Sequence, residues 1–433
     1  MKHLQWIAIC LLLGSCAKLM NSNRPAYHGP IVKALWHNSS LRIDRPPVIH
    51  NGVVYAAGHP WTGHDFRRVF AFDLKTGQQL WMSDFAAEKV LLATDSIVFV
   101  PTLGGGQVHT LDAATGKDIT LVYPVSFEDA SIADGVLYTT TFGRVEARSM
   151  ATYLKDLKIQ SRLDHSKALW QVHIPIDASR GIAPAVAGDG VYVASFQDFR
   201  LEPRHRDASA VYALDSKTGD VRWSWEPDSG RKDVPIPYGI TADASGVYVW
   251  LHDISESVIG KGILLALDAE TGREKWRHKT SIYVHSCPSP LLIAPDQVLA
   301  CDYPAGDQGS AIETGFLYQR LNRETGKKMG ESQTSWKYES YVAADGKLFV
   351  SDHQVHEVLT ENNNNSPDSW VTAVSLDTGK ELWRSQTLVL GILTTPAAGE
   401  GVVVVGSDVF KWGDPGREGK HDVAGLWAWT IEQ

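Results

Sequence analysis

The stretch Val69-Phe-Ala-Phe-Asp-Leu-Lys-Thr-Gly-Gln-Gln-Leu-Trp81 decides the fold, because the same phrase returns along the chain. Three close copies and two degenerate ones begin at Val211, Leu264, Val371, Val108 and Leu317. A second phrase precedes each copy and consists of a Gly, Asp or Ser turn followed by a β-branched or aromatic run. It occurs eight times, from Val53 to Val402, which gives a period of about 50 residues.

Each period predicts four antiparallel strands, which we call A to D. Tight A–B turns are indicated by Asn51-Gly52, Asp134-Gly135, Asp189-Gly190 and Asp345-Gly346. Four-stranded units at this spacing are typical of β-propeller blades. The sequence therefore predicts an all-β, eight-bladed propeller of four-stranded antiparallel blades. Its last blade ends at strand C near Ala428, so we expect an N-terminal strand D around Trp36 to close the ring.

Small and large residues coincide within the repeat. The sets are Ala71, Gly77 and Trp81; Ala213, Gly219 and Trp223; Ala266, Gly272 and Trp276; and Ala373, Gly379 and Trp383. We expect each strand-D indole to lie over the strand-C alanine, at the seam between blades, with Trp36 and Ala428 as a further pair. In the third repeat, residues 148–167 replace the tight C–D turn, and their spacing predicts a short helix or excursion.

The N-terminus indicates export. Residues 1–15 have a basic start and a short apolar run, which predicts a signal peptide and not a membrane-spanning helix. Cys16 follows this run behind two small residues, as in a bacterial lipobox. We therefore expect a lipid at Cys16, a tether over residues 16–30 and a single propeller over residues 31–433. The predicted location is the outer membrane, facing the periplasm or the cell surface, with membrane contact only through the lipid.

Charge and cysteine content exclude several classes. The chain has 41 basic and 50 acidic residues without a basic block, which argues against nucleic-acid binding. Cys287 and Cys301 are the cysteines that follow Cys16, and a disulfide and two buried thiols are equally open for them. No zinc-ribbon or haem-attachment spacing is present. We expect a monomer.

The predicted B–C and D–A connections lie on one face, where six repeats have long polar loops. Candidate binding residues there are His59, Trp61, His64, Arg67, Arg200, His205, His353 and Trp412. The alternative is that these side chains are solvated or paired locally. No residue pattern in the sequence indicates a catalytic, metal or cofactor site, so none is predicted.

The phrase ALDxxTGxxxW resembles the repeat of the quinoprotein-like (PQQ-type) eight-bladed propellers. Together with the lipobox and the length, it resembles the outer-membrane β-barrel assembly lipoproteins of BamB type. This resemblance implies a non-enzymatic scaffold that binds an envelope protein complex, for example the barrel-assembly machinery. An extracytoplasmic propeller that binds a ligand or glycan, or acts as a sensor, is the alternative.

The resemblance also extends to PQQ-dependent dehydrogenases, which bind the quinone with calcium. Those enzymes hold the quinone between a tryptophan and a disulfide of adjacent cysteines, and hold calcium with Glu, Asn and Asp. Adjacent cysteines are absent from this sequence. We therefore expect no enzyme activity and no cofactor, with PQQ and calcium as the less favoured reading.

Overall fold

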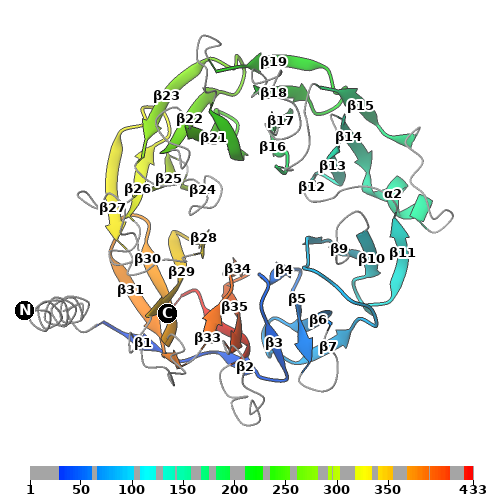
Figure 1. Cartoon of the computed structure of the whole chain (residues 1–433), viewed down its shortest axis with the longest axis vertical. Helices are drawn as coiled ribbons and strands as arrows, with labels where there is room; N and C mark the ends of the chain where they lie inside the picture. Colours follow the sequence, from blue (N-terminus) through cyan, green and yellow to red (C-terminus); the bar gives the residue numbers. More distant parts are fainter. Residues whose placement is uncertain are drawn as a thin grey trace, which may run out of the picture.

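The computed structural model confirms an all-β propeller of eight blades arranged in a ring (Figure 1). It describes residues 29–60, 66–101, 108–122, 130–141, 144–157, 167–174, 182–195, 210–227, 235–253, 261–280, 291–294, 296–302, 317–333, 340–354, 368–389, 391–409 and 424–432. The predicted signal peptide, Cys16 and the tether up to residue 28 lie outside these residues, so they stay predictions.

The first four blades follow one another along the chain. Blade 1 contains β3 (Leu41–Ile43), β4 (Val48–His50), β5 (Val53–Pro60), β6 (Arg68–Asp73) and β7 (Gln79–Met82). Blade 2 contains β8 (Leu92–Ala93), β9 (Ile97–Pro101), β10 (Val108–Asp112) and β11 (Asp118–Val122). Blade 3 contains β12 (Ala130–Ala133), β13 (Val136–Thr141), β14 (Arg144–Ser149), the helix α2 (Met150–Leu157) and β15 (Trp170–His173). Blade 4 contains β16 (Ala185–Ala187), β17 (Gly190–Ser195), β18 (Ala210–Asp215) and β19 (Val221–Trp225).

The other four blades complete the ring. Blade 5 contains β20 (Ile236–Ala242), β21 (Gly246–Asp253), β22 (Lys261–Asp268) and β23 (Glu274–Lys279). Blade 6 contains β24 (Leu291–Ala294), β25 (Gln297–Asp302), β26 (Leu317–Asn322) and β27 (Lys328–Gln333). Blade 7 contains β28 (Ser340–Ala344), β29 (Lys347–Gln354), β30 (Asp368–Ser375), β31 (Glu381–Ser385), β32 (Leu388–Val389) and the N-terminal β1 (Ile31–Val32). Blade 8 contains β33 (Gly391–Leu393), β34 (Ala397–Gly399), β35 (Val402–Val409), β36 (Gly425–Thr430) and β2 (Trp36–Asn38).

The two ends of the chain share a blade. β2 pairs antiparallel with β36, and Trp36 lies opposite Ala428. The segment before it also pairs, because β1 lies parallel to β31 on the outer edge of blade 7. The N-terminal segment therefore crosses from the rim of blade 7 to the rim of blade 8 before blade 1 begins.

The C–D turns owe their shape to the Asp-x-x-Thr-Gly phrase. In blade 1 the Asp73 carboxylate accepts hydrogen bonds from the Thr76 amide and hydroxyl, both at 2.8 Å. Gly77 then takes a φ of 68°, a left-handed conformation that favours glycine. The same carboxylate-to-threonine bonds form at Asp112 and Asp268. The phrase thus specifies the turn directly.

The repeat tryptophans join neighbouring blades. Trp81 is the register partner of Ala71 in its own blade, while its indole Nε1 donates to the Ala113 carbonyl of blade 2 at 2.9 Å. A Cβ built on Gly116 would lie 2.3 Å from the Trp81 ring, so only glycine fits beneath the indole. The same contact joins Trp36 to Gly77, Trp170 to Gly219, Trp223 to Gly272 and Trp276 to Gly326. The glycine that receives each indole therefore belongs to the next blade.

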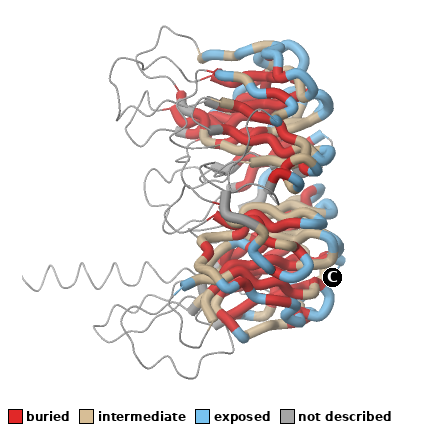
Figure 2. Tube along the Cα trace, turned by 90° about the vertical axis from the view of Figure 1, so that its right-hand side faces the viewer, coloured by how far each residue is buried: buried red, intermediate tan, exposed pale blue. Residues whose placement is uncertain are grey.

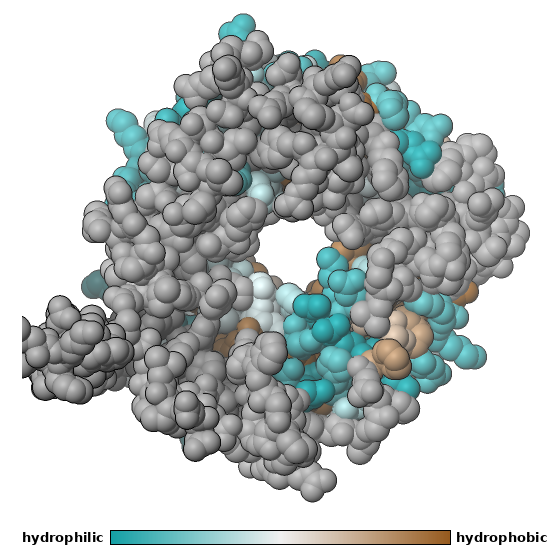
Figure 3. Space-filling model, viewed as in Figure 1, coloured by the Kyte–Doolittle hydropathy of each residue, from teal (hydrophilic) through white to brown (hydrophobic). Residues whose placement is uncertain are grey.

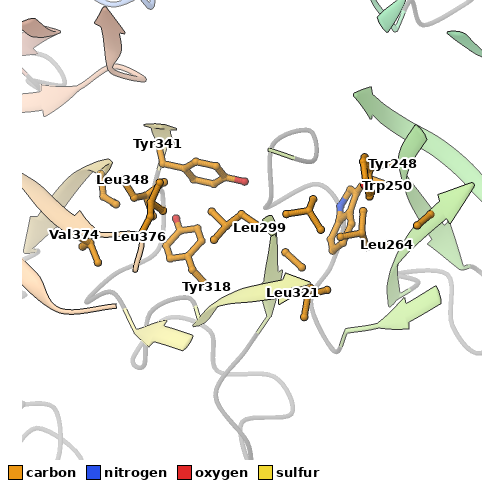
Figure 4. Close-up of a cluster of buried hydrophobic side chains, with 14 of the residues drawn as sticks. Tyr248, Trp250, Leu264, Leu299, Tyr318, Leu321, Tyr341, Leu348, Val374 and Leu376 are labelled. Carbon is orange, nitrogen blue, oxygen red and sulfur yellow. The ribbon is translucent and has the colours of Figure 1, made fainter. Parts of the chain in front are cut away.

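Two seams have no tryptophan on strand D, and at a third, between blades 7 and 8, the Trp383 indole Nε1 has no hydrogen-bond partner among the described residues. Between blades 2 and 3 the space is filled by α2, the helix expected in this blade, and its Tyr153 packs against Phe99 with ring centroids 5.7 Å apart. Between blades 6 and 7 the buried Arg320 donates to the carbonyls of Leu376 and Asp377. Near this seam Tyr318 and Tyr341 meet edge to face in a core that blades 5 to 7 share (Figure 4).

Buried charges attach α2 to the blade. Arg148, which is 2% exposed, donates from Nη2 to Glu146 Oε1 at 2.6 Å. On the helix, Asp156 lies 3.7 Å from Arg148 Nη1 and accepts from Lys167 Nζ at 2.6 Å. Glu146 and Asp156 thus both have a cationic neighbour, which offsets the cost of burying their charge.

Candidate functional site on the loop face

Alternating strand direction gives the ring two different faces. The A–B and C–D turns all lie on one face, where they form an exposed border (Figure 2). The B–C and D–A connections belong to the opposite face, which we call the loop face. Most of the long connections predicted from the sequence fall outside the described residues. Figure 3 shows the loop-face side of the ring, with an opening through its centre.

The structure describes three of the eight candidate binding residues. His59 lies in β5, Arg67 immediately precedes β6, and His353 lies in β29 opposite Ser369. The candidates outside the described residues are Trp61, His64, Arg200, His205 and Trp412. Of the three, His59 and Arg67 come together in blade 1, whereas His353 belongs to blade 7.

Asp44 is the residue that joins them. β3 pairs with β5, so that Arg42 lies opposite His59 and Asp44 follows at the end of the strand. Arg67 donates from Nε to Asp44 Oδ1 at 2.8 Å and from Nη2 to Asp44 Oδ2 at 2.6 Å. His59 Nε2 lies 3.8 Å from the same Oδ2. This two-bond geometry is the strong form of an arginine–carboxylate pair.

The electrostatics of the pair follow from this geometry. Burial raises the pKa of Asp44, but His59 and Arg67 outweigh it and hold that pKa well below its usual range. The Asp44 carboxylate in turn raises the pKa of Arg67. Each group therefore favours the charged form of the other, and the two form an ion pair.

A second pair of opposite charges connects blade 1 to blade 8. Arg42 Nη1 lies 3.8 Å from Asp408 Oδ1 on β35, so opposite charges face each other across the seam. Phe66, which precedes Arg67 in the sequence, exposes 59% of its surface. We call Arg42, Asp44, His59, Arg67 and Asp408 the blade 1 charge cluster.

Other candidate features lie elsewhere or outside the described chain. Cys301 lies in β25, but Cys287 falls outside the described residues, so the disulfide stays a prediction. Across the described ranges, no group of three or more His, Cys, Asp or Glu side chains is placed to hold a metal ion. Within the same residues, no helix is long and apolar enough to cross a membrane.

Sequence reasoning missed Asp44, Asp408 and Phe66. Asp44 follows the alternating segment Leu41-Arg42-Ile43, which is a strand pattern, but nothing local indicates that this strand pairs with β5. Phe66 belongs to the same predicted long connection as Trp61, and no residue pattern distinguishes it there. The alternation of apolar and charged residues from Leu41 to Asp44 is thus the one sequence pattern that indicates this part of the cluster.

The fold and repeat agree with known proteins. A family model described as outer membrane protein assembly factor BamB matches residues 33–119 and 159–356. The chain belongs to this family. The matched segments include blade 1 and four residues of its charge cluster, and omit Asp408 and residues 120–158, which contain α2.

Individual relatives include enzymes. Quinohemoprotein alcohol dehydrogenase ADH-IIG from Pseudomonas putida is 24% identical over 256 residues, which cover 50% of this chain and 34% of the relative. The match therefore spans about a third of that protein's length.

Two solved structures share the fold. BamB from Moraxella catarrhalis matches with a TM-score of 0.53 at 16% identity, covering 92% of this chain and 99% of that one. Quinohemoprotein alcohol dehydrogenase from Comamonas testosteroni matches with a TM-score of 0.54 at 12% identity, covering 92% of this chain and 76% of that one. At such identities the likeness concerns the propeller alone.

Proposed function

We propose that this protein is a non-enzymatic scaffold of the bacterial cell envelope that holds a partner protein on its loop face. Its place is the assembly of outer-membrane proteins, in keeping with the description of its family. A lipid at Cys16 anchors it to the outer membrane through the tether. Replacing Cys16 by serine should move the protein from the membrane fraction to the soluble fraction, whereas Cys301→Ser should leave it membrane-bound.

The observation that carries this proposal is the blade 1 charge cluster. The Asp44–Arg67 pair is locked by two hydrogen bonds, and each group favours the charged form of the other, so it is suited to recognition. Phe66, the residue before Arg67, is exposed. Aromatic and arginine side chains contribute most of the binding free energy at protein interfaces.

The test compares two exposed apolar residues. Phe66 is 59% exposed on the loop-face side of blade 1, and Leu169 is 55% exposed at the rim of blade 3. Phe66→Asp should lower recovery of the barrel-assembly complex from envelope membranes by about tenfold or more, because it places a charge in the contact. Leu169→Asp should leave recovery at the wild-type level.

Two outcomes would contradict the proposal. If the wild type and both variants recover the assembly complex equally, the loop face of blade 1 is not part of the interface. Recovery of a glycan or of an unrelated ligand, without the assembly complex, would favour the ligand-binding alternative.

A quinoprotein dehydrogenase is the second candidate, favoured by the match to the Pseudomonas putida enzyme. The residues present do not fit the quinone site of such enzymes, because the whole sequence lacks two adjacent cysteines. The one mature cysteine that the structure describes, Cys301, lies within β25 with Ala300 and Asp302 as its neighbours. We therefore propose that no quinone or calcium is bound.

A further inference from the structure

The rim of the ring consists of the outermost strand of each blade, which has one unpaired edge. Such edges readily pair with another chain unless they are covered or carry charges. On blade 7 the edge is covered, because the Arg384 amide donates to the Pro30 carbonyl and the Gln386 amide to the Val32 carbonyl, both at 3.0 Å. A strand-D edge of this propeller therefore accepts a parallel extended segment.

Blade 1 has the same edge, and no residue that the structure describes covers it. Trp81 and Trp383 occupy equivalent places, opposite Ala71 and Ala373, so Met82 corresponds to Arg384. The Ser83 amide donates inward to the Val69 carbonyl at 2.8 Å. Since backbone groups alternate along a strand, the amide of Met82 points outward, away from β6. That amide has no hydrogen-bond partner among the described residues.

The edge of β7 also lacks charges. Among the outermost strands that the structure describes, each of the other seven carries an ionisable side chain, and those residues include His37, Asp118, His173, Arg222, Lys275, Lys328 and Arg384. β7 (Gln79–Met82) carries none. Its Leu80 is 51% exposed and its Met82 38% exposed. An uncharged edge with exposed apolar side chains is what proteins otherwise avoid.

We infer that the β7 edge is a docking site for an extended segment of a partner protein. The segment adds in parallel, as β1 does on β31, and its carbonyls accept from the amides of Met82 and Asp84. Because β7 has no charge to pair, the partner segment is apolar at the alternate positions that face Leu80 and Met82. This site is separate from the blade 1 charge cluster and does not depend on the proposed function.

Amide hydrogen exchange of the full-length protein tests this inference. The probe is a peptide with the sequence of residues 28–35, His-Gly-Pro-Ile-Val-Lys-Ala-Leu, because this segment contains β1. In the free protein, the amide of Met82 should exchange fast and that of Arg384 slowly. At saturation the peptide should slow exchange over residues 79–84 by about tenfold or more, and leave the charged edge of β23 unchanged.

Matched variants separate docking from folding. Leu80→Lys places a charge on the edge and should abolish the protection, while Val221→Lys on β19, where Val221 is 47% exposed, should preserve it. Absence of protection at any peptide concentration, or equal protection of β23, would overturn the inference. A dimer that Leu80→Lys dissociates would overturn it too, because the edge would then belong to a second copy.

Discussion

At the seam between blades 1 and 2, the Trp81 indole donates to the carbonyl of Ala113, the residue after the first position of the Asp-x-x-Thr-Gly turn. At the seam between blades 6 and 7, Arg320 donates to the carbonyl of Leu376, which has the same place in its own turn. A Cβ on Gly330, at the usual tryptophan position, would collide with the Arg320 guanidinium.

The comparison shows that the turn fixes the acceptor, whereas the donor can come from either of two strands. In most blades an alanine on strand C makes room for an indole from strand D. In blade 6 a glycine on strand D makes room for a guanidinium from strand C. At the seams between blades 1 and 2 and between blades 6 and 7, the hydrogen bond to the turn carbonyl is therefore kept although its donor differs. At the seam between blades 7 and 8 the tryptophan is kept instead, and Trp383 Nε1 has no hydrogen-bond partner among the described residues.

Removing an indole should have the largest effect. Trp81 is 8% exposed and fills the seam, so Trp81→Ala should lower the free energy of unfolding by about 3–5 kcal/mol. Denaturant unfolding followed by circular dichroism measures the loss. Leu80→Ala is the control, since Leu80 is 51% exposed on the same strand, and it should cost less than half as much.

Exchanging the two seam types should have the next largest effect. Arg320→Ala leaves the Leu376 carbonyl without its donor and opens a void, at a cost of about 2–4 kcal/mol. Adding Gly330→Trp to Arg320→Ala recreates the common pair and should restore most of that stability. If the double variant is no more stable than Arg320→Ala, the two seams are not interchangeable.

A smaller difference in stability is expected between alanine variants of Gly116, which lies beneath an indole, and Gly52, which does not. Gly116 has a φ of 69° and no room for a Cβ beneath Trp81, whereas Gly52 has a φ of 74° with nothing within 4 Å. Both alanine variants introduce backbone strain, but Gly116→Ala should cost about 1–3 kcal/mol more. Equal costs would mean that the indole does not press on the glycine.

The smallest effect concerns the blade 1 charge cluster and depends on pH. The pKa of Asp44 is lower in the folded chain than in the unfolded chain, so its contribution is complete above the unfolded value of about 4. That contribution is lost as the pH falls from there through the folded value. The free energy of unfolding of Asp44→Asn should therefore be lower than that of the wild type at pH 7, and the two values should converge in acid. The loss of unfolding free energy in Trp81→Ala should not change with pH.

The sequence predicted the blade count and the identity of the blade strands, because each repeat carries its own turn signals. It also paired Trp36 with Ala428, and these residues are register partners. It did not reveal which glycine receives each indole, since co-occurrence within a repeat suggested the same blade. It treated blade 6 as degenerate, because an exchange between Arg320 and Gly330 looks like a loss when each position is considered alone.

The candidate site was harder to predict for a physical reason. Asp44 meets Arg67 only because β3 pairs with β5, a long-range pairing that no turn residue signals. Most other candidates lie outside the described residues. Trp61, Trp412 and their neighbours therefore stay predictions.

Dye reduction by the purified protein with added PQQ, calcium and an alcohol tests most directly whether this propeller is a scaffold or an enzyme. A non-enzymatic scaffold gives no reduction above that of PQQ and calcium alone, at any protein concentration. Reduction that rises with the protein and requires both PQQ and calcium would contradict a purely structural role.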